Sequence, residues 1–176
     1  MKEEIKMDFL TLAKERYSVR KFDGRPVAKE DIDKILEAGI VSPTAKNLQP
    51  ERIFVVQSEE GIAKLNECTD CIYGAKTAIL ICYDKNESWK RDCDGKDSGD
   101  VDCSIIATQM MLEAHSIGVG TTMVMWYDSA KLREVLELPE NLIDVCILTM
   151  GYPSEAAKPS FRHSQRKPVE DVVSYI

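Results

Sequence analysis

Hydrophobic residues recur along the chain with two different periods. Apolar residues three or four positions apart predict helices over residues 8–16, 28–40, 59–68, 100–116 and from Asp128 or Ser129 to Leu138. Short runs rich in apolar and β-branched residues predict strands over residues 52–57, 77–83 and 145–150, and a short strand or extended turn over residues 121–126. Helices that alternate with a few strands are typical of an α+β or α/β sandwich.

The predicted helix 100–116 is the longest, and it has no clear polar face. Its apolar residues point to nearly every side: Ile105, Ile106, Ala107, Met110, Met111, Leu112 and Ala114. A helix of this kind must be covered all round. We therefore expect it to lie at the centre of the fold, covered by its own chain and open to cover by a second one.

The remaining segments are less regular. Asp8 is a suitable N-cap for the first helix, whose apolar residues Phe9, Leu12 and Ala13 predict an inner face. Residues 85–99 form a charged loop without a recognisable pattern, and the tail after Ala157 is basic and aperiodic. Since the chain contains no repeat or linker, residues 1–176 are expected to form a single domain.

The charge pattern sets two basic clusters against an acidic chain. The net charge of −7 argues against nucleic acid as a partner, because duplex binding needs a cationic face. The cations gather near both ends: Lys14, Arg16, Arg20, Lys21 and Arg25, then Lys158, Arg162, Arg166 and Lys167. This pattern is compatible with one small anion held by both clusters, or with two solvated charged faces.

Two polar stretches stand out as candidate binding segments. Residues 16–22 place Arg16 and Arg20 on either side of Ser18, and guanidinium forks beside a hydroxyl suit a phosphate. Residues 42–50 are bracketed by prolines and rich in side chains that can bond a ligand directly.

Several other classes of protein are disfavoured. No run reaches the ~20 apolar residues of a membrane span, and the start shows no signal-peptide core, so a cytoplasmic protein without membrane contact is expected. The six cysteines are then expected to be buried thiols. Cys68 and Cys71 form a C-x-x-C pair, typical of redox motifs or half a zinc site, but neither His115 nor His163 stands at finger spacing. We therefore predict no metal ligand.

Common catalytic motifs are also missing from the sequence. Gly118-Val119-Gly120 has Met123 where a dinucleotide fingerprint needs its third glycine, and it follows a predicted helix rather than a strand. There is no phosphate-binding Walker sequence and no nucleophile elbow. Anion-binding groups without catalytic machinery favour an enzyme whose cofactor performs the chemistry.

Five segments in sequence order resemble the nitroreductase family of FMN-dependent oxidoreductases. They are residues 16–22, residues 42–50, the helix running into Gly118-Val119-Gly120, residues 150–153 and residues 166–170. The resemblance covers nearly the whole chain. It implies an intertwined homodimer with a mostly antiparallel central sheet flanked by helices, and two FMN molecules at the subunit interface.

The resemblance also implies which residues bind FMN. The phosphate, ribityl and pyrimidine end would be held by Arg16, Tyr17, Ser18 and Arg20, with Arg166 and Lys167 reaching the phosphate from the tail. The partner subunit would line the flavin with Pro43, Thr44, Ala45 and Asn47, in a loop supported by Gln49. The segment 123–126 would pass the flavin ring, which adds Met123, Met125 and Trp126 to the site.

The implied activity is ping-pong hydride transfer from NADH or NADPH, through FMN, to a nitroaromatic, a quinone or a similar acceptor. No side chain is predicted to be catalytic. Glu51, Met123, Trp126 and Ser164 depart from the family pattern, which leaves the acceptor and the choice between NADH and NADPH open. Alternatives are a flavin reductase, a dehalogenase, a flavin-fragmenting enzyme or a non-catalytic FMN-binding protein. A metal-dependent structural module built on Cys68 and Cys71 is a further class.

Overall fold

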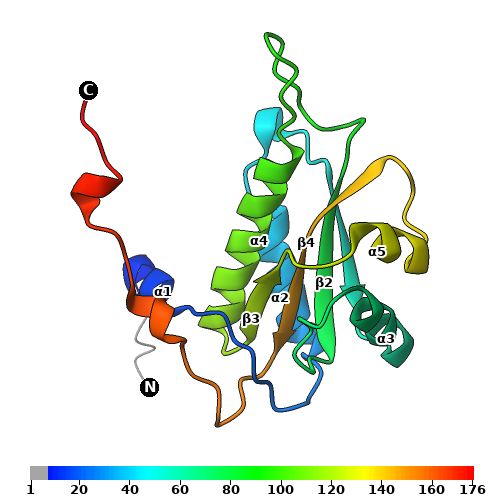
Figure 1. Cartoon of the computed structure of the whole chain (residues 1–176), viewed down its shortest axis with the longest axis vertical. Helices are drawn as coiled ribbons and strands as arrows, with labels where there is room; N and C mark the ends of the chain where they lie inside the picture. The colour runs from blue at the N-terminus through cyan, green and yellow to red at the C-terminus, as the bar shows by residue number, and fades with distance from the viewer. Residues whose placement is uncertain (1–7) are drawn as a thin grey trace.

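The computed structural model describes residues 8–176, in which helices cover both faces of a four-stranded sheet (Figure 1). The strands are β1 (Glu51–Val56), β2 (Thr77–Asp84), β3 (Gly120–Val124) and β4 (Leu142–Gly151). Their order across the sheet is β1-β2-β4-β3, and each neighbouring pair is antiparallel. The predicted α+β sandwich with an antiparallel central sheet is confirmed.

The two helical layers bury opposite faces of the sheet. The layers consist of α2 (Lys29–Ile40) with α4 (Gly99–Ser116), and of α3 (Glu59–Cys68) with α5 (Ser129–Val135). Strand β2 shows why both are needed: Ile79 and Ile81 pack with α2 and α4, while Leu80 packs with α3 and α5. All of β2 is buried, which explains its continuous apolar run.

Helix α4 is central, as its sequence predicts. It packs closely against α2, where a Cβ added at Gly39 would lie 2.3 Å from Cε of Met110. The absence of a side chain at Gly39 therefore allows the two helices to approach. The outer flank of α4 is open in the single chain, since Val101 is 52% exposed.

Helix α1 (Phe9–Glu15) begins as predicted but packs differently. Oδ1 of Asp8 caps it by accepting hydrogen bonds from the backbone N–H groups of Leu10 at 3.0 Å and Thr11 at 3.1 Å. The prediction that Phe9 and Ala13 lie on an inner face is wrong, because both are exposed, Phe9 by 71%. The reason is its position at the margin of the fold, where it packs beside α4 and buries no residue fully.

Smaller differences concern the ends of elements and the irregular segments. Strand β3 ends at Val124 rather than at residue 126, and α5 ends at Val135 because the chain turns at Glu137, which has a φ of 53°. Residues 85–99 form a hairpin, closed by a bridge between Lys90 and Asp97, rather than an irregular loop. Three short 3-10 helices complete the structure: η1 (Ala45–Asn47), η2 (Phe161–Ser164) and η3 (Val169–Asp171).

The C-terminal arm extends away from the body of the molecule (Figure 1). It consists of the residues after β4, and η2 places its first part beside α1. No helix among residues 8–176 is long and apolar enough to cross a lipid bilayer. The predicted single domain includes residues 1–7, which lie outside the described part.

Candidate functional site

The arginine stretch after α1 is held by its central residue. Val19 is 1% exposed; its N–H donates to the carbonyl of Thr121 at 2.9 Å, and its carbonyl accepts from the hydroxyl of Thr122. A Cβ at Gly120 would lie 2.6 Å from the Val19 side chain, so β3 and this stretch are in direct contact. This anchoring holds the stretch against β3, with Ser18 and Arg20 at a cavity beside it.

The cavity has a volume of about 430 Å³ and brings the two basic clusters together. It is lined by Arg16, Tyr17, Ser18, Arg20, Ser160, Phe161, Arg162, His163 and Arg166. Burial of the Arg16 guanidinium lowers the pKa of that group, and the nearby charge of Arg166 lowers it further. The cavity is therefore a concentrated positive site, suited to a multiply charged anion.

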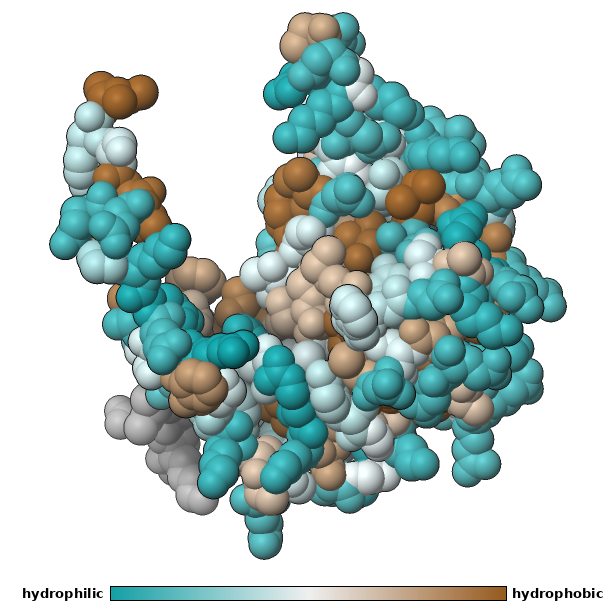
Figure 2. All heavy atoms as spheres, viewed as in Figure 1, coloured by the Kyte–Doolittle hydropathy of each residue, from teal (hydrophilic) through white to brown (hydrophobic). Residues whose placement is uncertain are grey.

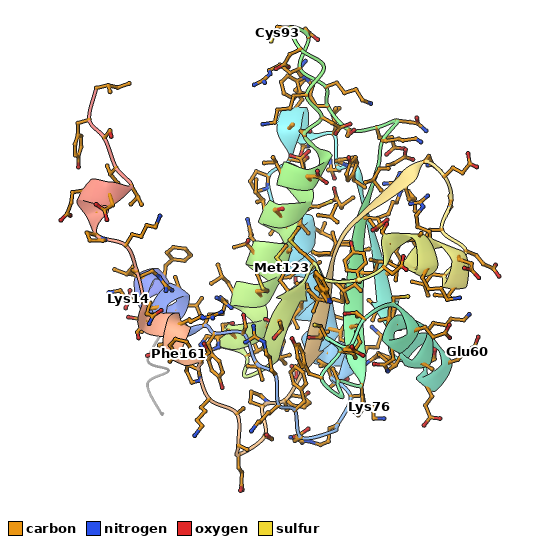
Figure 3. The ribbon with its side chains drawn as sticks, in the orientation of Figure 1. Lys14, Glu60, Lys76, Cys93, Met123 and Phe161 are labelled. Carbon is orange, nitrogen blue, oxygen red and sulfur yellow. The ribbon has the colours of Figure 1, made fainter. Side chains whose placement is uncertain are left out.

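The tail reaches this cavity through η2. Figure 3 shows Phe161 of η2 near Lys14 of α1, and the rings of Tyr17 and His163 meet edge to face at 6.2 Å. The guanidinium of Arg166 donates to the carbonyls of His163 at 2.6 Å and Gln165 at 2.8 Å. These contacts position Arg166 before any ligand arrives. Lys167 is exposed and does not line the cavity.

Four lining residues were not among the predicted site residues: Ser160, Phe161, Arg162 and His163. For Arg162 the sequence contained a signal, because this residue belongs to the basic cluster of the tail. The other three carry no signal of their own, because an aperiodic tail does not reveal which of its residues return to the body.

The predicted loop 42–50 is held by hydrogen bonds and lies at the start of α4. The N–H of Ala45 donates to Oδ1 of Asp102 at 2.9 Å, and Asp102 is only 3% exposed. The Thr44 hydroxyl accepts from the N–H of Gln49 at 3.1 Å, and the Gln49 side chain donates to the carbonyl of Asn47 at 3.2 Å. Gln49 thus supports the loop.

The backbone of this loop is strained. Lys46, Asn47 and Gln49 have φ values of 52°, 54° and 52°, in the left-handed region that favours glycine. Of the three, only asparagine tolerates this region readily. Strain of this kind persists where the surroundings impose it and is concentrated at ligand sites. It marks the loop as a second candidate binding element.

The loop and the arginine cavity lie at opposite ends of α4. Asp102 holds the loop at the first turns, whereas the charge of Arg16 helps to lower the pKa of His115 near the last turn. Asp102 and His115 stand 13 positions apart, or roughly 20 Å at ~1.5 Å per residue. The arginine cavity contains no residue of the loop. One chain therefore does not bring the two predicted halves of the site together.

The third predicted element is the segment after β3. Met123 packs against the core beside α4, while Met125 and Trp126 are 70% and 82% exposed. The segment is tied to the C-x-x-C turn, because the Trp126 carbonyl accepts from the Thr69 hydroxyl. This arrangement presents two large apolar side chains at the surface.

Four of the six thiols are buried as expected, whereas Cys71 is half-buried and Cys93 is exposed. Residues 8–176 contain no group of three or more His, Cys, Asp or Glu side chains placed to hold a metal ion. Burial raises the pKa of Cys82 and of Cys146 to about 12 each, so these thiols remain protonated near neutral pH. Cys68 is buried, and its thiol donates to the carbonyl of Lys64 at 3.2 Å.

Known proteins resemble this chain in sequence and in fold. The sequence model of the nitroreductase family matches residues 13–70 and 68–152. A nitroreductase family protein from Clostridium difficile 630 has 42% identity and a TM-score of 0.91, over 96% of this chain and 98% of that one. An FMN-dependent nitroreductase from C. difficile R20291 has 28% identity and a TM-score of 0.77, over 94% and 98%. A Methanothermobacter thermautotrophicus protein, provisionally named NADH dehydrogenase/NAD(P)H nitroreductase, is 32% identical over 85% of this chain and 80% of its own.

Proposed function

Because the chain belongs to the nitroreductase family, we propose that it is an FMN-dependent oxidoreductase that passes hydride from NAD(P)H, through the flavin, to a small electron acceptor. One observation carries the proposal. Arginines from two segments about 150 positions apart converge on one cavity, where Arg16 and Arg166 are close enough to repel each other. Such a site requires an anion to balance it.

The cavity fits the phosphate of FMN. None of Arg16, Arg20, Arg162 and Arg166 has a carboxylate within 4.0 Å among residues 8–176. Their guanidinium forks match phosphate oxygens, and the Ser18 hydroxyl supplies a further donor. Arg16, Ser18 and Arg166 are assigned to the phosphate, with Tyr17 and Lys167 at its margin.

A second copy of the chain would complete the site. A two-fold axis that crosses α4 places the start of one α4 beside the end of the other. The loop with Pro43, Thr44, Ala45, Asn47 and Gln49 of one chain then reaches the arginine cavity of its partner. In this proposal, the homodimer completes a site that α4 divides within each chain.

The surface beside α4 supports this assembly. A groove of about 860 Å³ runs along the outer flank of α4 and is lined by Phe9 and Leu12 of α1 and by Val101, Ile105 and Leu112 of α4. Figure 2 shows hydrophobic side chains on the flank that faces the C-terminal arm. An apolar groove of this size on a lone chain favours an interface. The partner's α4 would fill it.

The bound flavin would accept hydride from NAD(P)H and deliver it to the acceptor. The role of the chain is to orient the ring and to tune its charge. Arg20 lines the phosphate cavity, and its guanidinium carbon lies 5.9 Å from the centroid of the Tyr73 ring. In the proposed site, it would stabilise negative charge at the pyrimidine edge of the flavin. The flavin ring would be bordered by Met123, Met125 and Trp126. The large apolar side chains of Met125 and Trp126, which are exposed in the single chain, would exclude water from the ring. No side chain is assigned to proton transfer.

Anaerobic reduction of the purified protein tests the proposal. The protein should be yellow, and NADH or NADPH should bleach its flavin absorbance without added acceptor. Subsequent addition of a nitroaromatic, a quinone or free flavin should restore the colour and identify the acceptor. A protein that binds FMN but keeps its colour with both nucleotides would be a flavin-binding protein without turnover. A protein with no flavin affinity would overturn the whole assignment.

A further inference from the structure

The hairpin between β2 and α4 projects beyond the N-terminal end of α4. Figure 3 shows Cys93 at its tip, far from Lys76 at the opposite end of the molecule. Its strands are joined by backbone hydrogen bonds from Arg91 to Lys96 at 3.0 Å and from Ser98 to Trp89 at 2.9 Å. Trp89 therefore lies at the base of the hairpin, near the strained loop 42–50.

A small cavity separates the hairpin from that loop. Its volume is about 260 Å³, below the ~300–1,000 Å³ of pockets that enclose a whole drug-sized ligand. Ala45, Val101 and the indole of Trp89 form apolar walls, and Arg91 and Lys96 are the cations that line it. The cavity thus accommodates a fragment of a larger ligand, with one flat face and a charged edge.

The acidic groups in the wall are already engaged. Asp97 accepts from the Ser88 hydroxyl at 2.8 Å and lies 3.7 Å from the ammonium of Lys90. Asp102 accepts from the Ala45 N–H at 2.9 Å and from the Ser98 hydroxyl at 2.8 Å. These carboxylates therefore do not face the cavity as unpaired negative charges.

Two of the nearby cations have no such partner. Lys96 and Lys46 make no ion pair within 4.0 Å among residues 8–176, whereas Arg91 is paired with Asp94. The ammonium of Lys46 lies 5.6 Å from the centroid of the Trp89 ring, which links the loop to the hairpin. Unpaired positive charge beside a half-buried indole suits an aromatic ring with a negative group beside it.

We propose that this cavity binds an aromatic ring together with an anionic group on the ring or on a sugar attached to it, as the outer part of a substrate that reaches the flavin. The inference rests on the proposed function, in which Ala45 lies beside the flavin held by the partner chain. Lys96 would contact the anionic group, and Trp89 would contact the ring. The hairpin then selects substrates by charge.

Two substrates carry this chemistry. One is the hydride donor NADPH, whose adenosine bears a 2′-phosphate that NADH lacks. The other is an anionic aromatic acceptor, such as 4-nitrobenzoate, for which 4-nitrobenzamide is a neutral counterpart of almost the same shape. Each pair differs only in the anion, so each reports on Lys96 directly.

Steady-state kinetics of the flavin-loaded protein test the proposal. Lys96→Met keeps the length of the side chain and removes its charge, and Lys76→Met is the matched control at the far end of the molecule. In Lys96→Met, KM for the anionic member of one pair should rise about tenfold, the loss expected for one charge-assisted contact. KM for its neutral counterpart, and every KM of Lys76→Met, should change by less than about twofold. A rise in KM for NADPH would identify the hydride donor as the ligand of the cavity. A rise in KM for 4-nitrobenzoate would identify the acceptor as the ligand.

Tryptophan fluorescence provides a readout that does not depend on turnover. Titration with 2′,5′-ADP or benzoate should produce a saturable change in emission, whereas adenosine or benzamide should not. The change should be lost in Trp89→Phe and weakened in Lys96→Met. If neither anion gives a saturable signal and neither KM pair responds to Lys96→Met, the inference is wrong. Bleaching of the flavin by NADH or NADPH would then still support the proposed function.

Discussion

Arg16 and Arg166 line one cavity, and the positive charge of Arg166 contributes to a lowered pKa of Arg16. The two residues come from the end of α1 and from the C-terminal arm, and neither has a carboxylate partner within 4.0 Å among residues 8–176. Like charges held together by the fold repel each other. In the proposed site, a phosphate bound between them would relieve this repulsion.

Loss of either arginine should weaken FMN binding. Arg16→Ala and Arg166→Ala each remove one charge-assisted contact, which costs about 1.5–3 kcal/mol and lowers affinity roughly ten- to over a hundredfold. Quenching of flavin fluorescence on binding measures the change. Arg25→Ala is the control, since Arg25 is paired with Asp23 outside the cavity. Wild-type affinity in either cavity variant would show that its arginine does not bind the phosphate.

Inorganic phosphate should raise the melting temperature of the flavin-free protein. Chloride at equal ionic strength should have a smaller effect, because a ligand that binds the folded state alone stabilises it by mass action. In Arg166→Ala the difference between phosphate and chloride should shrink, since the repelling pair is gone. Differential scanning fluorimetry measures both effects. An equal response of wild type and variant would place the phosphate elsewhere.

Substitution of Gly120 by alanine should damage the site through the backbone. The new Cβ would lie 2.6 Å from Val19, and overpacking of this kind costs about 1–3 kcal/mol. Urea unfolding measures the loss of stability, and flavin titration should show weaker binding because the arginine stretch is displaced. The double variant with Val19→Ala should lose less than the sum of the two single effects. Additive losses would show that the two side chains do not compete for space.

The stability of the protein should depend on His115 as the pH falls. Burial lowers the pKa of His115 below its usual 6.5, and the charge of Arg16 lowers it further. The unfolded chain therefore takes up the proton more readily than the folded chain. The contribution of His115 to the free energy of unfolding is complete above about pH 6.5 and declines as the pH falls below that value. Between about pH 7.5 and 5.5, the wild type should lose more free energy of unfolding than His115→Gln. Equal losses in urea titrations would exclude this role.

A charge in the groove along α4 should separate the subunits. Ile105→Glu would bury a carboxylate in the apolar groove, so the dimer should dissociate at least about tenfold more readily. Sedimentation measures the assembly, and FMN affinity should fall with it because, in the proposed dimer, the partner would supply half of the site. Ala63→Glu on the exposed side of α3 is the control. An Ile105→Glu monomer that binds FMN normally would refute the shared site.

Local sequence patterns determined most of the secondary structure and the character of the binding groups. The run from Thr77 to Tyr83 is apolar at nearly every position because β2 is buried on both faces. Helix α4 is apolar where it packs against the sheet and α2, whereas its outer flank is open in the single chain. Arg16, Ser18 and Arg20 were recognisable because guanidinium groups beside a hydroxyl have a distinct chemistry. One exception was α1, where Phe9 follows the helical period but lies at an exposed margin.

Only the tertiary structure decided which of these groups meet. The return of η2 to α1 places Phe161 and His163 at the arginines, and the length of α4 separates Ala45 from the same cavity. Periodicity reports on neighbours within a few positions, whereas these relationships join residues far apart in sequence through packing. The cavity beneath the hairpin, between Trp89 and Ala45, arises in the same way. The sequence therefore indicated the candidate binding groups, and the packing around α4 determined where each of them lies.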